Sequence, residues 1–417
     1  MINRKIATVA LGLTAMALTA CGATDNGGSG TTGSTDITYW CPETDSQFME
    51  GVVTRFKEAN PDFKGTIRLL ANVGEGDVKS EIQKDPSAAA DVVCIADDNI
   101  RDLVSSRSLL EFDTTETAEI VKNNGASNTS AAQVGGKTYG IPYRGDNGYQ
   151  LIYDKALVSA DDCSTLEGLL KEAKDGGYKV GFDIGNGWYI ASLFFANDIK
   201  LEYNGNGDFT TDINSDKGLA MLKSVYSLYT QYKDTWLIDS NATGFGTSAA
   251  SRKCAQIIWN AYDDIKTAVG EDNVGVAALP TINIGGTAKH LYTYAGVKAI
   301  SVVKKSNATD ERNTWCKAFA KYIASSKEQE NRLTTLNQGV TDLSVVAKTD
   351  LWTSPFLVSL AKQEGDGYSQ VQSTHANGNY WDAAAKLMAT ITGATTTLTD
   401  DDLKSALETC QAAILKE

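Results

Sequence analysis

The alternation of strand-like and helix-like segments limits the possible folds more than any other feature of this sequence. Residues 37–40 are a β-type run, and apolar side chains then recur at helical spacing from Phe48 to Phe56. Residues 91–96 are almost continuously apolar, as in the buried strands of parallel sheets. Such alternation predicts an α/β fold. A second series continues it, with predicted strands at 149–154, 178–183, 254–259 and 274–278 and predicted helices at 165–174 and 217–232.

The length of the chain points to two lobes. Residues 36–417 have an ordinary globular composition, and they exceed the roughly 250–300 residues at which a single core stops growing. The formal net charge is −14, so the chain lacks the basic surface that nucleic acids require. Nucleic acid is therefore not an expected partner, and a polyanionic ligand is disfavoured as well.

The N-terminus predicts export. Arg4 and Lys5 precede an uncharged stretch at residues 6–20, which is typical of a secretory signal and shorter than the roughly 20 apolar residues that span a bilayer. The stretch ends Leu-Thr-Ala-Cys-Gly and resembles a lipobox. Residues 1–20 are then a lipoprotein signal peptide, and Cys21 is the acylated (palmitate-bearing) mature N-terminus; an ordinary signal peptide with a chance cysteine is the alternative.

The residues after Cys21 predict a flexible tether. Residues 21–35 consist almost wholly of small and polar side chains, which cannot form a core. This tether predicts a folded part held at the outer face of the bacterial cell membrane.

The sequence offers little to metal or nucleophilic chemistry. Apart from Cys21, six cysteines are scattered without a Cys-x-x-Cys or Cys/His cluster, and the two histidines, His290 and His375, are isolated. No Gly-x-Ser-x-Gly, His-Glu-x-x-His or phosphate loop is present. We therefore expect that the protein binds no metal and no cofactor and that it is not an enzyme. The alternative from the enzyme class is a lipid-anchored glycoside hydrolase, because carboxylates are plentiful and such enzymes need a pair about 5–9.5 Å apart.

Several separated segments carry a family resemblance through their order and spacing. They are residues 37–40 with the helix at 48–61, then 91–98, 136–142 with 151–155, 274–280 and 317–323. Together they resemble the extracellular solute-binding proteins of ABC importers, the family that includes the maltose-binding protein. The resemblance implies a monomeric binding protein that captures an oligosaccharide and delivers it to the membrane permease.

The resemblance also implies a periplasmic-binding-protein-like fold with the ligand in a cleft between two α/β lobes. The chain would cross between the lobes three times, near residues 141–147, 289–297 and 345–352. One lobe would then comprise residues 36–143 with 297–345, and the other residues 147–290 with 352–417. In this fold the first and third strands are neighbours, so Cys41 and Cys94 are expected to lie within the Cα separation of about 7 Å that a disulfide allows.

A sugar offers apolar C–H faces and a rim of hydroxyls, so its site should combine aromatic rings with carboxylates and amides. For Asp45 and Asp98 the alternative role is that of helix-capping acids, worth about 1 kcal/mol. For Trp188 and Tyr189 the alternative is packing. Tyr262 is alternatively a plain surface aromatic. The positions that match ligand contacts of the maltose-binding protein are Glu43, Asp45, Asp98, Asn99, Asp146, Asn186, Trp188, Tyr189, Tyr262, and Tyr380 or Trp381.

Two departures from the family affect the expected cargo. Asn99 stands where the family reference has a basic residue, and Ile95 stands where it has an aromatic one. The ligand set therefore differs in part, and a malto-oligosaccharide is the best guess within the class of oligosaccharides. A non-sugar solute is the alternative, but the aromatic residues of the second lobe favour a sugar over an amino acid or a metal.

Overall fold

The computed structural model describes residues 35–416, except 43–44, 72, 74–75, 205–206, 240–243, 247, 249–250 and 259–260. The predicted signal peptide, Cys21 and Glu43 therefore lie outside the described residues. Among the helices that are described, none is long and apolar enough to cross a membrane.

One sheet has six strands in the order β17-β16-β3-β1-β2, with β6 also paired to β16. β1 pairs in parallel with β2 and β3, and β16 runs antiparallel to β3 and β6. All five residues of β3 are buried, as the sequence predicts for a strand inside the sheet. The strands are β1 (Ile37–Trp40), β2 (Ile67–Leu70), β3 (Val92–Ala96), β6 (Ile141–Asn147), β16 (Thr293–Val302) and β17 (Ser369–Val371).

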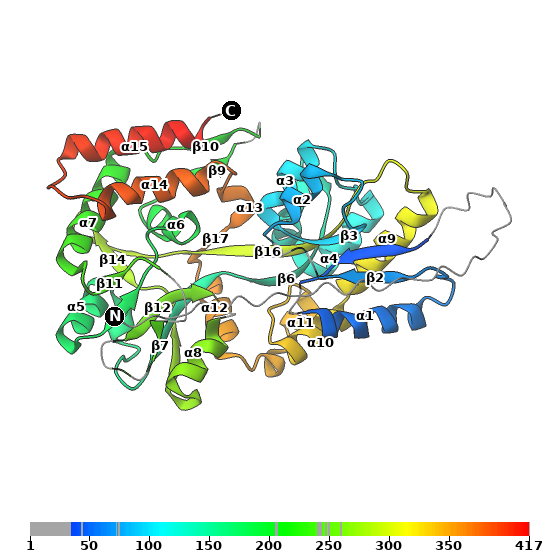
Figure 1. Ribbon diagram of the computed structural model, residues 1–417, viewed down its shortest axis with the longest axis horizontal. Helices are drawn as coiled ribbons and strands as arrows, with labels where there is room; N and C mark the ends of the chain where they lie inside the picture. Colours follow the sequence, from blue (N-terminus) through cyan, green and yellow to red (C-terminus); the bar gives the residue numbers. More distant parts are fainter. Residues whose placement is uncertain are drawn as a thin grey trace, which may run out of the picture. The chain divides into compact units, whose positions relative to one another are not determined.

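The helices that pack on this six-stranded sheet bury their apolar faces against it. Met49, Val52 and Phe56 recur at helical spacing on α1 and are buried, and the Phe56 ring meets Phe319 edge-on at 5.1 Å between ring centroids. These residues belong to one core cluster. The helices are α1 (Ser46–Ala59), α2 (Val78–Lys84), α3 (Asp97–Ser105), α4 (Thr114–Ser130), α9 (Asp310–Ile323), α10 (Ser326–Leu336) and α11 (Leu343–Val346) (Figure 1).

A second sheet has five strands in the order β11-β8-β12-β7-β13. The strands are β7 (Tyr149–Asp154), β8 (Lys179–Gly181), β11 (Trp236–Leu237), β12 (Arg252–Ile258) and β13 (Val274–Ala277). Its helices are α5 (Leu166–Gly176), α6 (Gly187–Ala196), α7 (Asp216–Tyr232), α8 (Tyr262–Val269), α12 (Pro355–Gly365), α13 (Gln372–His375), α14 (Tyr380–Thr392) and α15 (Asp400–Ile414). The α/β prediction is therefore confirmed.

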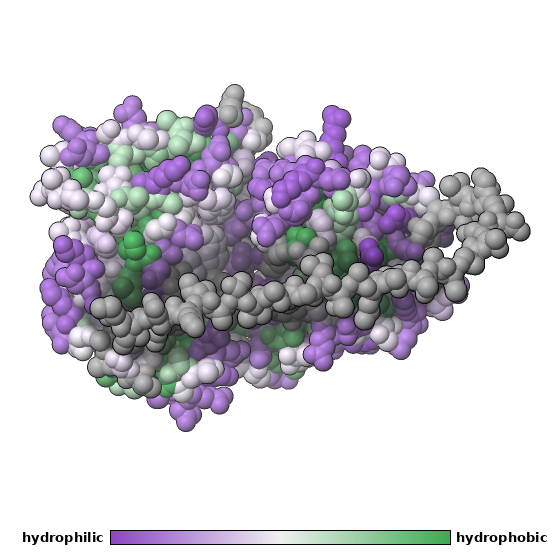
Figure 2. All heavy atoms as spheres, viewed as in Figure 1, coloured by the Kyte–Doolittle hydropathy of each residue, from purple (hydrophilic) through white to green (hydrophobic). Residues whose placement is uncertain are grey.

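Short elements complete the described fold. They are the strand pairs β4 (Gln133–Val134) with β5 (Lys137–Thr138), β9 (Leu201–Tyr203) with β10 (Phe209–Thr211) and β14 (Thr281–Ile284) with β15 (Thr287–His290), and the 3₁₀ turns η2 (Asp162–Ser164), η5 (Glu271–Asn273) and η6 (Thr349–Leu351). Hydrophilic residues dominate the face in Figure 2, as expected when apolar side chains are gathered into cores.

The two sheets are connected by strands that run from one to the other. β6 of the first sheet leads into β7 of the second through Gly148 alone. A Cβ atom at Gly148 would lie 2.8 Å from the Tyr294 carbonyl oxygen, so only glycine fits between these strands. β16 begins beside β17 and ends beside β3, which makes it the return connection. A third passage leads from α11 to α12 through η6.

The register of β1 and β3 bears on the two cysteines predicted to be neighbours. Trp40 lies opposite Val93, so the same register continued by one residue brings Cys41 opposite Cys94. Adjacent strands are about 4.8 Å apart, which is within disulfide range. The structure holds both as buried thiols, and Cys94 Sγ lies 3.1 Å from Tyr143 Oη. The disulfide itself stays a prediction.

Candidate functional site

Two adjacent aspartates begin α3, directly after the buried strand β3. Asp97 Oδ2 accepts a hydrogen bond from the Ser373 backbone N–H at 3.1 Å. Burial raises the pKa of Asp97 to about 8, and the neighbouring Asp98 charge adds to this effect. Burial also raises the pKa of Asp98, against opposing effects of the Lys298 charge and of a hydrogen bond from the Gln372 side chain. The predicted residue Asn99 follows on the same helix and is partly buried.

Both aspartates keep an unused acceptor. The Oδ1 atoms of Asp97 and Asp98 are buried and have no hydrogen-bond partner within the described part of the chain. Buried polar atoms are rarely left unpaired. This edge of the first sheet therefore has two buried carboxyl oxygens without a hydrogen-bond donor from the described residues.

Trp188 lies at the start of α6. The predicted residue Asn186 caps this helix, since its side-chain oxygen accepts from the Trp188 backbone N–H at 2.8 Å. The Trp188 indole is partly buried, and its Nε1–H donates to Gln372 Oε1 at 2.8 Å. Its ring packs edge-on against Tyr149 at 4.7 Å and Tyr189 at 4.9 Å between centroids. The indole is thus fixed by one hydrogen bond at Nε1 and by two edge-on contacts with tyrosine rings.

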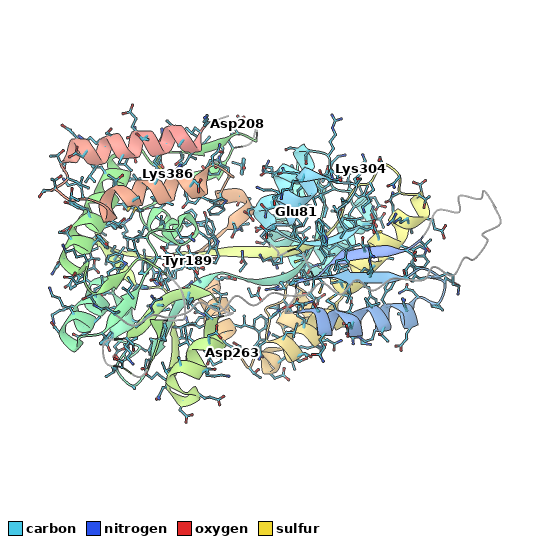
Figure 3. All side chains as sticks on the ribbon, viewed as in Figure 1. Glu81, Tyr189, Asp208, Asp263, Lys304 and Lys386 are labelled. Carbon is cyan, nitrogen blue, oxygen red and sulfur yellow. The ribbon has the colours of Figure 1, made fainter. Side chains whose placement is uncertain are left out.

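Tyr189 supports Trp188 from the interior. Its side chain is buried, and Figure 3 shows it inside the part of the molecule built on the second sheet. Of the two roles considered for Tyr189, the structure favours packing, because a buried ring offers no free face to a ligand.

Asn147, which the sequence analysis missed, joins Trp188 and Asp98 at Gln372. Its Nδ2 donates to Gln372 Oε1 at 3.1 Å. A Cβ atom at Gly296 would collide with the Asn147 side chain, so glycine there leaves room for the amide. We call Asp98, Asn147, Trp188 and Gln372 the Gln372 cluster.

The predicted residue Asp146 points the other way. Its Oδ2 accepts from the Gly339 backbone N–H at 2.9 Å, and its Oδ1 lies 3.4 Å from Arg144 Nη2. Successive side chains of a strand face opposite sides, so Asp146 and Asn147 cannot both face the cluster. The role of Asp146 as a ligand contact stays a prediction. No pattern in the sequence of β6 (Ile141–Asn147) separates the two residues.

Asp45 occupies the position before α1, and its side chain is engaged in an ion pair. It is buried without a side-chain capping bond. Its carboxylate pairs with Arg332 Nη1 at 2.5 Å and accepts from Gln338 Nε2 at 3.1 Å. Breaking a buried ion pair costs about 3–5 kcal/mol, so a sugar hydroxyl does not displace Arg332. The capping role considered for Asp45 is therefore wrong, while its role as a ligand contact stays a prediction.

The two candidates on α14 differ in exposure. Tyr380 is completely buried, and its Oη donates to the Gly187 carbonyl oxygen at 2.9 Å. It therefore has no surface for a ligand and serves to pack α14 on α6. Trp381 is partly buried and meets Tyr294 edge-on at 6.0 Å. Trp381 is the one of the pair that retains an accessible ring.

Tyr262 lies in a cavity whose lining residues do not include any member of the Gln372 cluster. It lines a cavity of about 420 Å³ together with Lys155, Asp263 and Lys266, next to Asn337 at the end of α10. Figure 3 places Asp263, the residue after Tyr262, near the edge of the molecule. The role of Tyr262 as a ligand contact stays a prediction, and the structure places its cavity apart from the residues of the Gln372 cluster.

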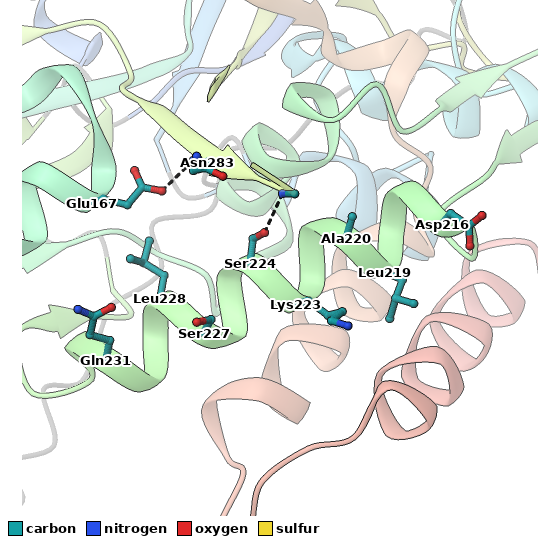
Figure 4. Close-up of a pocket in the computed structure, with 11 residues that line it drawn as sticks. Glu167, Asp216, Leu219, Ala220, Lys223, Ser224, Ser227, Leu228, Gln231 and Asn283 are labelled. Carbon is teal, nitrogen blue, oxygen red and sulfur yellow. Dashed lines mark hydrogen bonds between the residues drawn. The ribbon is translucent and has the colours of Figure 1, made fainter. Parts of the chain in front are cut away.

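A further hollow lies elsewhere on the surface. A cavity of about 590 Å³ lies between α7 and the β14–β15 hairpin, where Glu167 accepts from the Asn283 backbone N–H at 2.7 Å (Figure 4). No aromatic ring is among its described lining residues, so it offers a pyranose no ring to stack on. Among the described residues there is also no group of three His, Cys, Asp or Glu that is suited to a metal ion.

Comparisons with known proteins agree with this architecture. The family described as "Bacterial extracellular solute-binding protein" matches residues 51–359. A search of curated proteins gave no match.

Solved structures share the fold over nearly the whole chain. A maltodextrin binding protein, MalE1 from L. casei BL23, without ligand, is 21% identical with a TM-score of 0.79, covering 92% of this chain and 100% of its own. A structure solved with acarbose is 26% identical with a TM-score of 0.78, covering 92% and 99%. A Thermus thermophilus maltotriose binding protein bound with maltotriose is 16% identical with a TM-score of 0.70, covering 91% and 100%. The predicted two-lobed fold is thereby confirmed.

Proposed function

The chain belongs to the bacterial extracellular solute-binding proteins, and we propose that it captures an oligosaccharide and delivers it to the permease of an ABC importer. Malto-oligosaccharides are the best candidates, because structural relatives include proteins that bind maltodextrin or maltotriose. The folded part would be held at the membrane by a lipid on Cys21.

The observation that carries this proposal is the Gln372 cluster. It combines a partly exposed indole, held at its edge, with a carboxylate and an amide within one hydrogen-bonded group. The indole supplies an apolar face for a pyranose, while Asp98 Oδ1 has an unused acceptor site for a hydroxyl. Sites of this kind are mostly apolar, with a few placed polar groups that fix orientation.

The same residues argue against several other cargoes. An anionic solute would lie beside the carboxyl groups of Asp97 and Asp98 and would disfavour their ionisation further. An amino acid would need a cation for its carboxylate, and Lys298 is the positive group that acts on both aspartates. A neutral polyol such as a sugar satisfies the unused acceptors without adding charge.

Calorimetry with a ligand panel tests the proposal. The panel contains maltose, maltotriose, maltopentaose, cellotriose, an oligogalacturonate and a mixture of amino acids, and each mixture is then analysed by chromatography. Saturable binding of neutral oligosaccharides, recovered intact, is the expected result. Binding of the oligogalacturonate or the amino acids alone would contradict the sugar assignment, and release of monosaccharide at enzymatic rates would show a glycoside hydrolase instead.

A further inference from the structure

Arg101 of α3 lies against Tyr203 of β9, although the two elements belong to different parts of the fold. The central carbon of the guanidinium group, Arg101 Cζ, is 3.9 Å from the centroid of the Tyr203 ring. A cation within about 6 Å of an aromatic face is attracted by the quadrupole of the ring. Both side chains are partly buried, so water screens this attraction only in part.

Each partner belongs to an element that is anchored in a separate core. Ile100 and Leu103 of α3 are buried in a core cluster that contains residues of β3. Leu201 of β9 is buried in another cluster, which contains residues of α6 and β7. The contact therefore joins the lobe of the six-stranded sheet to the lobe of the five-stranded sheet.

The surroundings of the pair favour stacking over an ion pair. The Arg101 Nε–H is buried and has no hydrogen-bond partner among the residues that the structure describes. The adjacent carboxylate, Asp102, is paired with Lys79 at 2.9 Å. The Tyr203 ring meets Phe209, its opposite residue in β10, edge-on at 5.0 Å between centroids. A planar guanidinium is well suited to rest on a ring that is fixed in this way.

The two candidate sugar contacts lie on the same two lobes as this pair. Asp98 precedes Arg101 by three residues, and α3 carries both. Trp188 of α6 packs against the core cluster that contains Leu201 of β9. Any movement of α3 relative to β9 therefore changes the separation of Asp98 and Trp188.

We propose that Arg101 and Tyr203 form a latch between the lobes, which holds Asp98 and Trp188 at the separation that lets both contact one sugar. The proposal rests on the proposed function and deepens it, because neither residue of the latch has to touch the sugar. When only the closed form binds a ligand, the Kd rises as the closed fraction falls. Loss of the latch lowers the closed fraction and so weakens binding.

Spin labels on the two lobes test the latch without a ligand. Lys304→Cys and Lys386→Cys provide exposed labelling sites, which Figure 3 shows in different parts of the molecule, while the cysteines of the described residues are buried. In the soluble Cys21→Ala protein, Arg101→Met should shift the label distances measured by pulsed electron paramagnetic resonance to longer values. Lys79→Met is the matched control, because this cation pairs with Asp102 of its own lobe, and it should leave the distances unchanged. Unchanged distances in Arg101→Met would overturn the proposal.

Binding kinetics test how the latch acts on the sugar. Arg101→Met and Tyr203→Ala should each raise the Kd for maltotriose by about two- to thirtyfold, as expected for the loss of a cation–π contact, and mainly through faster dissociation. The double variant should match either single variant within about twofold, because the two side chains act as one unit. Tyr203→Phe keeps the ring face and should bind like the wild type. Additive losses in the double variant would show that the two residues act separately and would overturn the latch.

The two experiments also separate the latch from the proposed function. A shift of the label distances in a protein that binds no oligosaccharide would reject the proposed function and support the contact between the lobes. Circular dichroism and thermal unfolding check that each variant folds. Arg101→Gln takes the place of Arg101→Met if the latter does not fold, and it must produce the same shift for the proposal to stand.

Discussion

Trp188 is the residue on which the candidate site depends most. Its indole N–H is bonded to Gln372, its edges meet two tyrosines, and its side chain remains partly exposed. An aromatic ring that is fixed before the ligand arrives loses little conformational freedom on binding. This favours a direct contact with the sugar over a role in packing alone.

Trp188→Ala should therefore weaken oligosaccharide binding by roughly thirtyfold or more, because truncation of such an anchor often costs about 2 kcal/mol or more. Calorimetry gives the Kd, and circular dichroism should show an intact fold. The comparison variant is Trp315→Ala, whose ring packs on Phe63 at 5.2 Å away from the Gln372 cluster. It should lower stability but leave the Kd unchanged, and normal sugar binding by Trp188→Ala would reject the site.

Asp97 should make stability depend on pH. Burial, followed by the charge of Asp98, raises its pKa to about 8, while an unfolded aspartate has a pKa of about 3.9. The folded state therefore binds this proton more tightly than the unfolded state. The resulting stabilisation is complete below about pH 4 and is lost as the pH rises towards about 8.

Asp97→Asn imitates the protonated side chain and removes this titration. The free energy of unfolding of the variant minus that of the wild type should increase as the pH is raised from about 5 to about 8. The increase should reach up to about 1.4 kcal/mol per pH unit. Urea unfolding at several pH values measures the difference. A difference that stays constant with pH would contradict the assignment.

At the scale of elements, the connection between the two sheets depends on close approach of strands. β6 and β7 are separated by Gly148, whose missing side chain lets the backbone lie against Tyr294 of β16 and the Leu360 side chain of α12. A methyl group there would lie within 3.0 Å of both, and the backbone atom cannot move aside as a flexible side chain would.

Gly148→Ala is accordingly expected to destabilise the protein by about 1–3 kcal/mol, the usual cost of forcing a methyl group into a packed region. Urea unfolding measures the change. Gly76→Ala is the matched control, because a Cβ atom there would meet nothing within 4 Å, and it should change stability by less than about 0.5 kcal/mol. Equal effects at the two positions would contradict the close-approach argument.

Elements with a strong apolar pattern could be predicted from the sequence, and this explains which site residues were found. β3 is buried along its whole length, so the strand and the aspartates that follow it were recognised. α13 has four residues and no periodicity, so nothing marked Gln372. Asn147 was missed because the sequence does not show which side chains of β6 lie next to Gln372. Asp45 was misjudged because its partner Arg332 is far away in sequence, and no local pattern reveals that contact.

At the scale of the whole molecule, the Gln372 cluster draws on both sheets. Asp98 follows a strand of the first sheet, Trp188 belongs to a helix beside the second, and Asn147 ends a strand that leads from one to the other. We expect a ligand bound by residues from both parts to favour their closure around it, because hinge motion of this kind lets both sets of contacts form at once. The permease would then recognise the loaded form.

Delivery to a permease also requires that the binding protein stay near the membrane, which makes Cys21 decisive for the function of the whole molecule. A single acyl chain gives only reversible attachment, and two are needed for a stable anchor. Cys21→Ala should therefore move the protein from the membrane fraction to the soluble fraction. Its Kd for sugar should stay unchanged, because residues 34–417 form a compact unit of their own. Cys410→Ala, which alters a buried cysteine on α15, should remain membrane-bound. Mass spectrometry that found an unmodified Cys21 in the mature wild-type protein, or a cleavage at another residue, would reject the anchor.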